Sequence, residues 1–544
     1  MTCRYTLKYL CGENERVLND SCENSEVLLK TAELPSRRTV TITAKQDICL
    51  LEYKEYDLPF AKTHANAEDL YFINGYQSWT DSHEKYLSET EHNLKKIPKA
   101  LMSAFSFESY GDYKFYDYDK SRFHGYDVFY KTGENGLFIG SMNYNNAYLI
   151  IEATRKSGAI TLKSDIKRKY LKAGESFTVC DYIYNNDYKS GLIDFQKHFG
   201  DKNIKKIFGY TSWYNYYQDI NEEILLRDLA GLDDRFNLFQ IDDGYETFVG
   251  DWLSISKEKF PNGLSPIVQA VHKKGYLAGI WLAPFVAEEK SRLFEEKKEW
   301  FKRDKNGEFI KCGSNWSGFY ALDLENREAR EYIKGCLKVY ADMGFDFFKL
   351  DFLYAANLPE YENKTRCEAA RDAYLLLREA LPEKLILGCG ATLINCANLF
   401  DYLRIGPDVS LKFDDVFYMR PMHRERISTK VTLQNTVFRH FTDNYLFGND
   451  PDVFLLRDDN ISLSPAQRKA LITLNSLFGS VMMTSDNIAE YSAEKKAELT
   501  AALDRFKNAK VIDYKRNGKI ITINYLLDNE TKQIKYHTGK GVLI

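Results

Sequence analysis

One rhythm dominates the chain between residues 205 and 490: a short apolar strand, a loop and an amphipathic helix, repeated several times. The residues spaced for one helical face after the first strand are Ile220, Ile224, Leu225, Leu229 and Leu232. Strand candidates can be placed eight times in this region, with the weakest pattern near 445–448 and 480–484. A length of about 285 residues is close to the size typical of a (β/α)8 barrel. The sequence therefore predicts a central TIM-type barrel over 201–490.

The flanking segments have a different pattern. Residues 1–200 alternate short β-branched and aromatic runs with polar turns, which predicts an N-terminal β-sandwich. From about residue 510 the β pattern returns, and we expect a small antiparallel C-terminal β-domain over 491–544. The whole chain is thus expected to be a multidomain α/β protein.

Two irregularities interrupt the barrel pattern. The segment from 285 to 327 is long, contains Trp300 and Trp316, and follows the third strand, where barrels carry their functional loops. We expect a lid or substrate loop there. Only about nine residues separate the fifth and sixth strands, too few for a crossover helix, so we expect a local distortion.

Composition excludes several classes of partner. A formal net charge of -4 over 544 residues gives no reason to expect nucleic acid. No apolar run reaches the length of about 18 residues that a membrane span needs, so no membrane partner is predicted. The first residues lack the apolar core of a secretory signal, and the 10 cysteines are scattered, which indicates reduced thiols and a cytoplasmic location. No histidine pair has metal-ligand spacing, and we predict neither metal nor other cofactor.

The strand 345–351 ends in two charged residues, Lys349 and Asp351. Side chains two residues apart in a strand point to the same face, so these two share one surface. A charged pair closing an apolar run costs free energy unless water or a partner meets it. This pattern is typical of a catalytic carboxylate at a barrel mouth; the alternative is a strand-end salt bridge.

Polar and aromatic groups also follow the other predicted barrel strands. They are Trp213 after the first strand, Asp242 and Asp243 after the second, Trp281 within the third, Cys389 after the fifth, and Arg404 and Asp408 at the sixth. Carboxylates, cations and aromatic rings meeting at one face suit a hydroxyl-rich ligand. Paired carboxylates from different strands are what glycoside hydrolysis needs.

Each of these residues also has a structural interpretation. Asp242 and Asp243 could cap a helix, and Arg404 could bridge strands. Trp213 and Trp281 could belong to the core, and Cys389 could serve packing. Structural roles, capping or holding a loop, are also the interpretation for two further aspartates, Asp450 and Asp452.

Four motifs together give the chain a family resemblance. They are Ile241-Asp242-Asp243-Gly244-Tyr245, Gly279-Ile280-Trp281-Leu282-Ala283-Pro284-Phe285, Lys349-Leu350-Asp351 and Arg404-Ile405-Gly406-Pro407-Asp408. With them the chain resembles the α-galactosidases of glycoside hydrolase family 36, in the clan shared with family 27. The resemblance covers the barrel, and extends more weakly to both β-domains.

The resemblance implies a retaining exo-α-galactosidase in which Asp351 is the nucleophile and Asp408 the general acid/base. The residues it implies for binding galactose hydroxyls are Asp242, Asp243, Lys349 and Arg404, with Cys389 and Gly390 near the 2-hydroxyl. In the family a tryptophan of the N-terminal β-domain closes the pocket, often of a neighbouring subunit, and Trp79 in the segment 74–79 is similar to it. The resemblance also implies a homo-oligomer.

The chain departs from the family pattern in two places, at 391–396 after the Cys-Gly pair and at 409–413 after Asp408. Both bear on the aglycone side of the site, and so on which α-galactoside oligosaccharide or glycoconjugate is preferred. Two alternative functions stay open: an α-N-acetylgalactosaminidase, decided by the room near Cys389, and a non-hydrolytic galactoside-binding protein.

Overall fold

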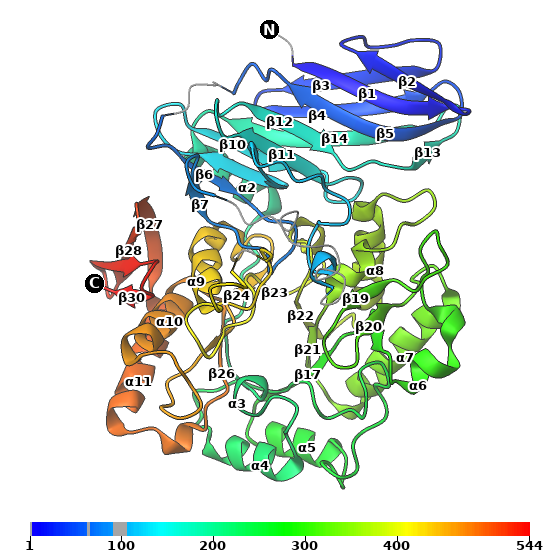
Figure 1. Cartoon of the computed structure of the whole chain (residues 1–544). Helices are drawn as coiled ribbons and strands as arrows, with labels where there is room; N and C mark the ends of the chain where they lie inside the picture. The colour runs from blue at the N-terminus through cyan, green and yellow to red at the C-terminus, as the bar shows by residue number, and fades with distance from the viewer. Residues whose placement is uncertain (1–2, 62–65, 91–105, 421) are drawn as a thin grey trace.

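The computed structural model describes residues 3–61, 66–90, 106–420 and 422–544. An N-terminal β-rich layer lies over one end of a larger α/β part, and a small C-terminal sheet packs beside the last helices (Figure 1). The chain is therefore multidomain α/β.

The described part of residues 3–185 forms two antiparallel sheets. One has the order β2–β1–β5–β12–β11–β8, with β13 beside β5, and the other the order β3–β4–β14–β10–β9–β6–β7. Their bounds are β1 Arg4–Cys11, β2 Asn14–Asn19, β3 Val27–Leu34, β4 Arg37–Ala44, β5 Ile48–Tyr56, β6 Leu70–Ile73, β7 Glu84–Tyr86, β8 Arg122–Tyr126, β9 Val128–Lys131, β10 Leu137–Ser141, β11 Leu149–Thr154, β12 Ile160–Ser164, β13 Lys169–Leu171 and β14 Ser176–Asn185. Apolar side chains of both sheets, such as Leu7 and Ile42, share one buried cluster, as in a sandwich.

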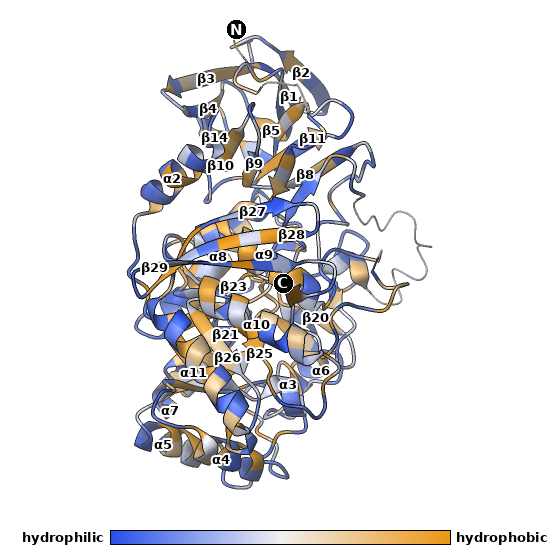
Figure 2. Ribbon diagram, turned by 90° about the vertical axis from the view of Figure 1, so that its left-hand side faces the viewer, coloured by the Kyte–Doolittle hydropathy of each residue, from blue (hydrophilic) through white to orange (hydrophobic). Residues whose placement is uncertain are grey.

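A curled parallel sheet forms the centre of the molecule. Its strands are β15 (Ile207–Thr211), β16 (Leu238–Ile241), β17 (Leu277–Leu282), β21 (Phe347–Leu350), β22 (Leu385–Gly388), β23 (Tyr402–Arg404), β24 (Gly448–Asp450), β25 (Val453–Phe454) and β26 (Val481–Thr484). The order is β24–β23–β22–β21–β17–β16–β15–β26–β25. The two ends of this order, β24 and β25, are separated in the chain only by Pro451 and Asp452. Figure 2 shows the interior strands β21 and β26 in the hydrophobic colour.

Helix α2 (Tyr188–Phe199) packs on strands β10 and β14 of the N-terminal layer. The other helices lie around the parallel sheet, and their bounds are α4 Glu222–Gly231, α5 Ser265–Lys273, α6 Arg292–Glu296, α7 Arg327–Met343, α8 Arg366–Ala380, α9 Thr429–Phe438, α10 Pro465–Phe478 and α11 Ala493–Asn508. Between β22 and β23 the chain forms only a short 3-10 turn, Ile394–Cys396, as the narrow spacing predicted. None of the described helices is long and apolar enough to cross a membrane.

Helix α7 shows how local sequence sets these elements. The side chain of Asn326 caps its first turn by accepting from the N–H groups of Glu328 and Ala329. Gly344 ends it with φ 107, in the left-handed region that favours glycine. The residues buried between these ends are Ala329, Ile333, Cys336, Leu337 and Tyr340. Their spacing of three and four residues gives the apolar face that packs against the sheet.

The long segment after β17 forms a small antiparallel sheet of its own. Strands β18 (Val286–Glu288), β20 (Phe319–Ala321) and β19 (Lys311–Gly313) pair in that order. The N-terminal layer contacts it, because Ser109 Oγ donates to the carbonyl oxygen of Lys311 at 3.0 Å. This segment carries Trp316, which reaches the candidate site described below.

The last part of the chain is an antiparallel sheet with the order β27–β28–β29–β30. Its strands are β27 (Lys510–Asn517), β28 (Ile520–Leu527), β29 (Glu530–His537) and β30 (Val542–Leu543). Helix α11 lies between the predicted boundary at 491 and the first of these strands. Helix α10, buried along most of its length, packs against α9, α11 and this sheet.

Candidate active site

The structure brings the predicted polar residues together at one edge of the parallel sheet. Trp213 begins the short helix α3 (Trp213–Tyr216) after β15, Asp242 and Asp243 follow β16, and Trp281 lies in β17. Lys349 and Asp351 stand at the end of β21, Cys389 and Gly390 follow β22, and Arg404 and Asp408 stand at the end of β23 and in the loop after it. Because the strands are parallel neighbours, their carboxyl ends share one edge.

Lys349 forms its ion pair with Asp242, the residue after the neighbouring β16 strand. The Nζ atom lies 2.9 Å from Oδ2 of Asp242, and both side chains are buried. Gln240 Nε2 and Thr211 Oγ1 donate to the same oxygen at 2.7 and 3.1 Å. Burial opposes the charge on Lys349, but Asp242 outweighs it and raises the pKa of the lysine. Lys349 is therefore held ionised, and the ion pair has a defined orientation.

The carboxylate of Asp351 is oriented by two N–H donors. Trp281 Nε1 donates to Oδ2 at 3.1 Å, and the backbone N–H of Phe352 donates to Oδ1 at 2.7 Å. Phe352 has φ 53, a conformation in which the chain turns sharply after the strand. Trp281 is thus buried in the core and also in contact with the candidate site. The core interpretation and the ligand interpretation of this residue are therefore compatible.

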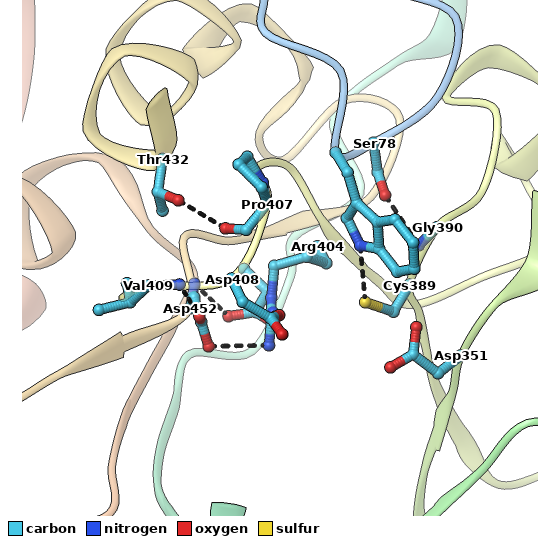
Figure 3. A network of polar contacts seen from close by, with 12 residues as sticks. Ser78, Asp351, Cys389, Gly390, Arg404, Pro407, Asp408, Val409, Thr432 and Asp452 are labelled. Carbon is cyan, nitrogen blue, oxygen red and sulfur yellow. Dashed lines mark hydrogen bonds and ion pairs between the residues drawn. The ribbon is translucent and has the colours of Figure 1, made fainter. Parts of the chain in front are cut away.

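Arg404 lies among three carboxylates. Its Nη1 atom is 2.9 Å from Asp408 Oδ1, Nε is 2.8 Å from Asp450 Oδ2, and Nη2 is 2.9 Å from Asp452 Oδ1. Figure 3 shows the contacts to Asp408 and Asp452. Asp450 and Asp452 are fully buried, whereas the Asp408 side chain is 32% exposed. Asp408 is therefore the carboxyl of this group that a ligand can reach.

One guanidinium cannot neutralise three carboxylates, so a proton is favoured on the group. Burial raises the pKa of Asp452 to about 7, against the opposing effect of Arg404. Burial also raises the pKa of Asp408, again opposed by Arg404 and Lys349 and supported by the charge on Asp351. Asp408, on one side of the site, thus has a raised pKa. On the other side, Asp351 is held by neutral N–H donors.

Asp243 is bound from two loops. Gln218 Nε2 donates to it at 3.1 Å, and Trp316 Nε1 donates to its Oδ2 at 2.9 Å. Burial raises the pKa of Asp243, and the negative charge of Asp242 raises it further, while the hydrogen bond with Glu246 lowers it. The expected substrate loop therefore reaches the site through Trp316.

Trp79 covers the Cys389–Gly390 corner of the site. Its indole Nε1 lies 3.3 Å from Cys389 Sγ, and its ring packs edge-on against Phe352 at 5.3 Å and Tyr354 at 5.5 Å. A Cβ atom added at Gly390 would lie 3.1 Å from the indole. The structure makes this contact within one chain, where the resemblance suggested a neighbouring subunit.

Four residues of this site were not among the predicted site residues. Tyr214 donates from Oη to Asp452 Oδ2 at 2.5 Å, and Asp450 and Asp452 bind Arg404. Trp316 was placed in the substrate loop but not in the site. The sequence Asn449-Asp450-Pro451-Asp452, which is similar to the family pattern, was the available signal for two of them. Tyr214 was expected among the polar groups after the first strand, and Trp316 only in the substrate loop.

The arrangement can perform acid/base and nucleophilic chemistry on a polar ligand. In Figure 3 the carboxyl groups of Asp351 and Asp408 point into the same space from the ends of different strands. Among the described residues, no three His, Cys, Asp or Glu side chains are grouped so that they could hold a metal ion.

The chain is similar in sequence to a known family and to several known enzymes. The melibiase family model matches residues 183–381. Alpha-xylosidase XylQ of Lactiplantibacillus pentosus is 29% identical over 40% of this chain and 29% of its own length. Alpha-galactosidase Mel36A of Lactobacillus acidophilus is 29% identical over 27% of this chain and 22% of its own length. The chain thus spans less than a third of the length of these curated relatives.

One similar solved structure is TtGalA, an alpha-galactosidase from Thermus thermophilus in complex with p-nitrophenyl alpha-D-galactopyranoside. It has a TM-score of 0.71 and 25% identity, over 97% of this chain and 98% of that chain. Together the comparisons confirm the resemblance to the family 36 α-galactosidases that the motifs indicated.

Proposed function

We propose that this chain, a relative of the glycoside hydrolase family 36 α-galactosidases, is a retaining exo-α-galactosidase that hydrolyses terminal non-reducing α-D-galactosyl residues. The observation that carries the proposal is the difference between its two carboxyls. Asp351 is oriented by N–H donors, and Asp408 shares one arginine with two buried carboxylates. Retaining glycosidases need such a pair, one to attack and one to hold a proton.

The reaction proceeds in two displacements. Asp351 attacks the anomeric carbon while Asp408 gives its proton to the glycosidic oxygen, so the C–O bond to the aglycone breaks and a β-linked galactosyl ester forms. Asp408, now ionised, takes a proton from water, and the resulting hydroxide displaces Asp351 from the anomeric carbon. Galactose leaves with its α configuration, and both carboxyls return to their first state.

Asp242, Asp243 and Lys349 bind galactose hydroxyls in this proposal. Charged acceptors and a buried ammonium make charge-assisted hydrogen bonds, which are stronger than neutral ones. Trp281 and Trp213 offer aromatic surface to the ring. Arg404 binds a galactose hydroxyl as well. Cys389 and Gly390 lie near the 2-hydroxyl, and Trp79 covers that corner. A pocket closed in this way accepts a terminal sugar.

The same corner speaks against the alternative activities. An N-acetyl group on carbon 2 needs space near Cys389, and Trp79 occupies it at 3.3 Å from the thiol. A protein that only binds galactosides has no need of two carboxyls in different proton environments. The likeness to TtGalA, an alpha-galactosidase whose structure matches 97% of this chain, supports this choice.

The test is release of nitrophenol from two substrates by the purified protein. We expect turnover of p-nitrophenyl α-galactoside and at least about a hundredfold lower kcat/KM on p-nitrophenyl α-N-acetylgalactosaminide, as for a site that leaves no room for a substituent. Preference for the second substrate would make the protein an α-N-acetylgalactosaminidase. Saturable binding of galactose without turnover of either substrate would make it a binding protein.

Several finer features belong to the same proposal. Strand β24 pairs with β23, and strand β25 pairs with β26, which supports a closed (β/α)8 barrel. In this barrel β24 and β25 together form the seventh strand. The domains would then be the sandwich 1–200, the barrel 201–490 and the C-terminal β-domain 491–544. Soluble α-galactoside oligosaccharides are the expected substrates, since TtGalA was solved with stachyose. The ten cysteines of this chain are free thiols, which suits a protein of the cytoplasm. The family resemblance also leads us to propose that the protein is a homo-oligomer.

A further inference from the structure

Tyr217 has an unusual backbone conformation and an exposed ring. Its φ of 49 and ψ of -131 lie in a region that is strained for any residue except glycine. Its N–H bonds to the carbonyl oxygen of Trp213 at 2.7 Å, and its ring packs edge-on against the Trp213 ring at 5.1 Å. The side chain nevertheless stays 41% exposed. An exposed aromatic ring does not by itself give enough stabilisation to offset the free-energy cost of this backbone strain. Strain of this kind often marks a functional position.

The neighbours of Tyr217 contact carboxylates on both sides of the candidate site. The next residue, Gln218, donates to Asp243 on one side of the site. Tyr214, three residues earlier, donates to Asp452 on the other side, and its carbonyl oxygen accepts from Arg457 at 2.7 Å. The short segment 213–218 therefore reaches both sides of the site, and Tyr217 lies between these two anchors.

The phenol also lies within electrostatic range of the candidate acid. Burial raises the pKa of Tyr217; the positive charge of Arg457 lowers it and the negative charge of Asp408 raises it. Asp408 is the partly exposed carboxyl of the Arg404 group. A general acid must face the oxygen that joins galactose to its leaving group. The segment of Tyr217 is anchored through Tyr214 to Asp452, which shares Arg404 with that acid, so the exposed ring lies on the leaving-group side.

We propose that Tyr217 forms the aglycone subsite, where its ring stacks on the first sugar of the leaving group. This rests on the proposed α-galactosidase function and extends it to the side of the site where the chain departs from its family. The apolar C–H face of a pyranose suits an exposed aromatic ring. The strained backbone has a reason here: it turns the Tyr217 ring outward while Gln218 still points to Asp243.

The test compares two substrates that differ only in the leaving group. Raffinose has a sugar at this subsite, whereas α-D-galactosyl fluoride has no ring there. We expect Tyr217→Ala to lower kcat/KM for raffinose about tenfold, as for loss of one aromatic stacking contact. The same variant should keep kcat/KM for the fluoride within about twofold of wild type. Tyr217→Phe, the matched control, keeps the ring and should keep raffinose activity.

Equal losses on both substrates, or no loss on raffinose, would overturn the assignment. Tyr217→Gly gives a second readout, because glycine relieves the positive φ. We expect its melting temperature to equal or exceed that of wild type while raffinose activity falls. A lower melting temperature in Tyr217→Gly, with both activities reduced, would assign the tyrosine to the fold instead. A wild-type protein inactive on the fluoride would refute the proposed function itself, before any variant is compared.

Discussion

The Nη1 atom of Arg404 lies 2.9 Å from Oδ1 of Asp408, and the same guanidinium also binds Asp450 and Asp452. The cation that faces the candidate acid is therefore divided among three carboxylates. Without the other two, Arg404 would favour the ionised form of Asp408 strongly. We infer that Asp450 and Asp452 allow Asp408 to keep its proton until the glycosidic bond breaks.

Asp452→Asn should narrow the pH range of activity. Removing this negative charge leaves Arg404 freer to stabilise ionised Asp408, so the pKa of Asp408 falls. The acid must be protonated to work, and the alkaline limb of kcat/KM against pH should move down by about one unit. Asp458→Asn, an exposed aspartate that pairs with Arg468, is the control and should leave the profile in place. An unmoved alkaline limb in Asp452→Asn would contradict this role.

Asp242→Ala and Asp243→Ala should each lower kcat/KM for an α-galactoside at least tenfold. Each change removes charged hydrogen bonds worth roughly 1.5–3 kcal/mol apiece. The first also leaves the buried Lys349 ammonium without its partner. Initial rates over a range of substrate concentrations measure the effect. Rates like those of wild type in both variants would show that these carboxylates do not hold the sugar.

Trp79→Ala should raise KM several-fold, because the indole covers the site at 3.3 Å from Cys389 Sγ. The melting temperature should fall as well, because the buried ring packs against Phe352 and Tyr354. The closure is within one chain, which a mixing experiment can test. Chains carrying Trp79→Ala and chains carrying Asp351→Gly, unfolded and refolded together, should recover no more activity than the two alone. Recovery beyond their sum would mean that one subunit's tryptophan completes another subunit's pocket.

Arg439→Lys should reproduce part of the Trp79→Ala effect. Arg439 is fully buried and donates to the carbonyl oxygens of Gln77 and Ser78 on one side and of Ile405 on the other. It therefore fastens the Trp79 loop to the end of β23. If it acts through Trp79, the double variant should have the KM of Trp79→Ala alone. Additive increases in KM would assign Arg439 a separate role.

Sequence patterns predicted the parallel sheet and the clustering of polar residues at one of its edges, because both follow from local rules. The period of two in 345–351 placed Lys349 and Asp351 together, and the recurring strand ends gathered Asp242, Asp243, Arg404 and Asp408. Local sequence rules do not predict contacts that are made through long loops. Trp316 approaches Asp243 only because the segment after β17 folds back as a small sheet.

Two other contacts could not be predicted for a related reason. Asp450 and Asp452 were interpreted as structural residues that cap a helix or hold a loop, and sequence spacing cannot show that both side chains also bind Arg404. The motif around Trp79 was recognised, but a motif does not say whether its pocket belongs to the same chain.

The most direct test of the two catalytic assignments is the anomer formed in azide rescue of two glycine variants. In Asp408→Gly, the β-linked ester on Asp351 still forms from an aryl α-galactoside with a good leaving group, and azide should convert it to the α-galactosyl azide. In Asp351→Gly, azide should occupy the place of the nucleophile and give the β-galactosyl azide. Reversed anomers would exchange the two roles, and full activity without azide in either variant would remove that residue from the mechanism.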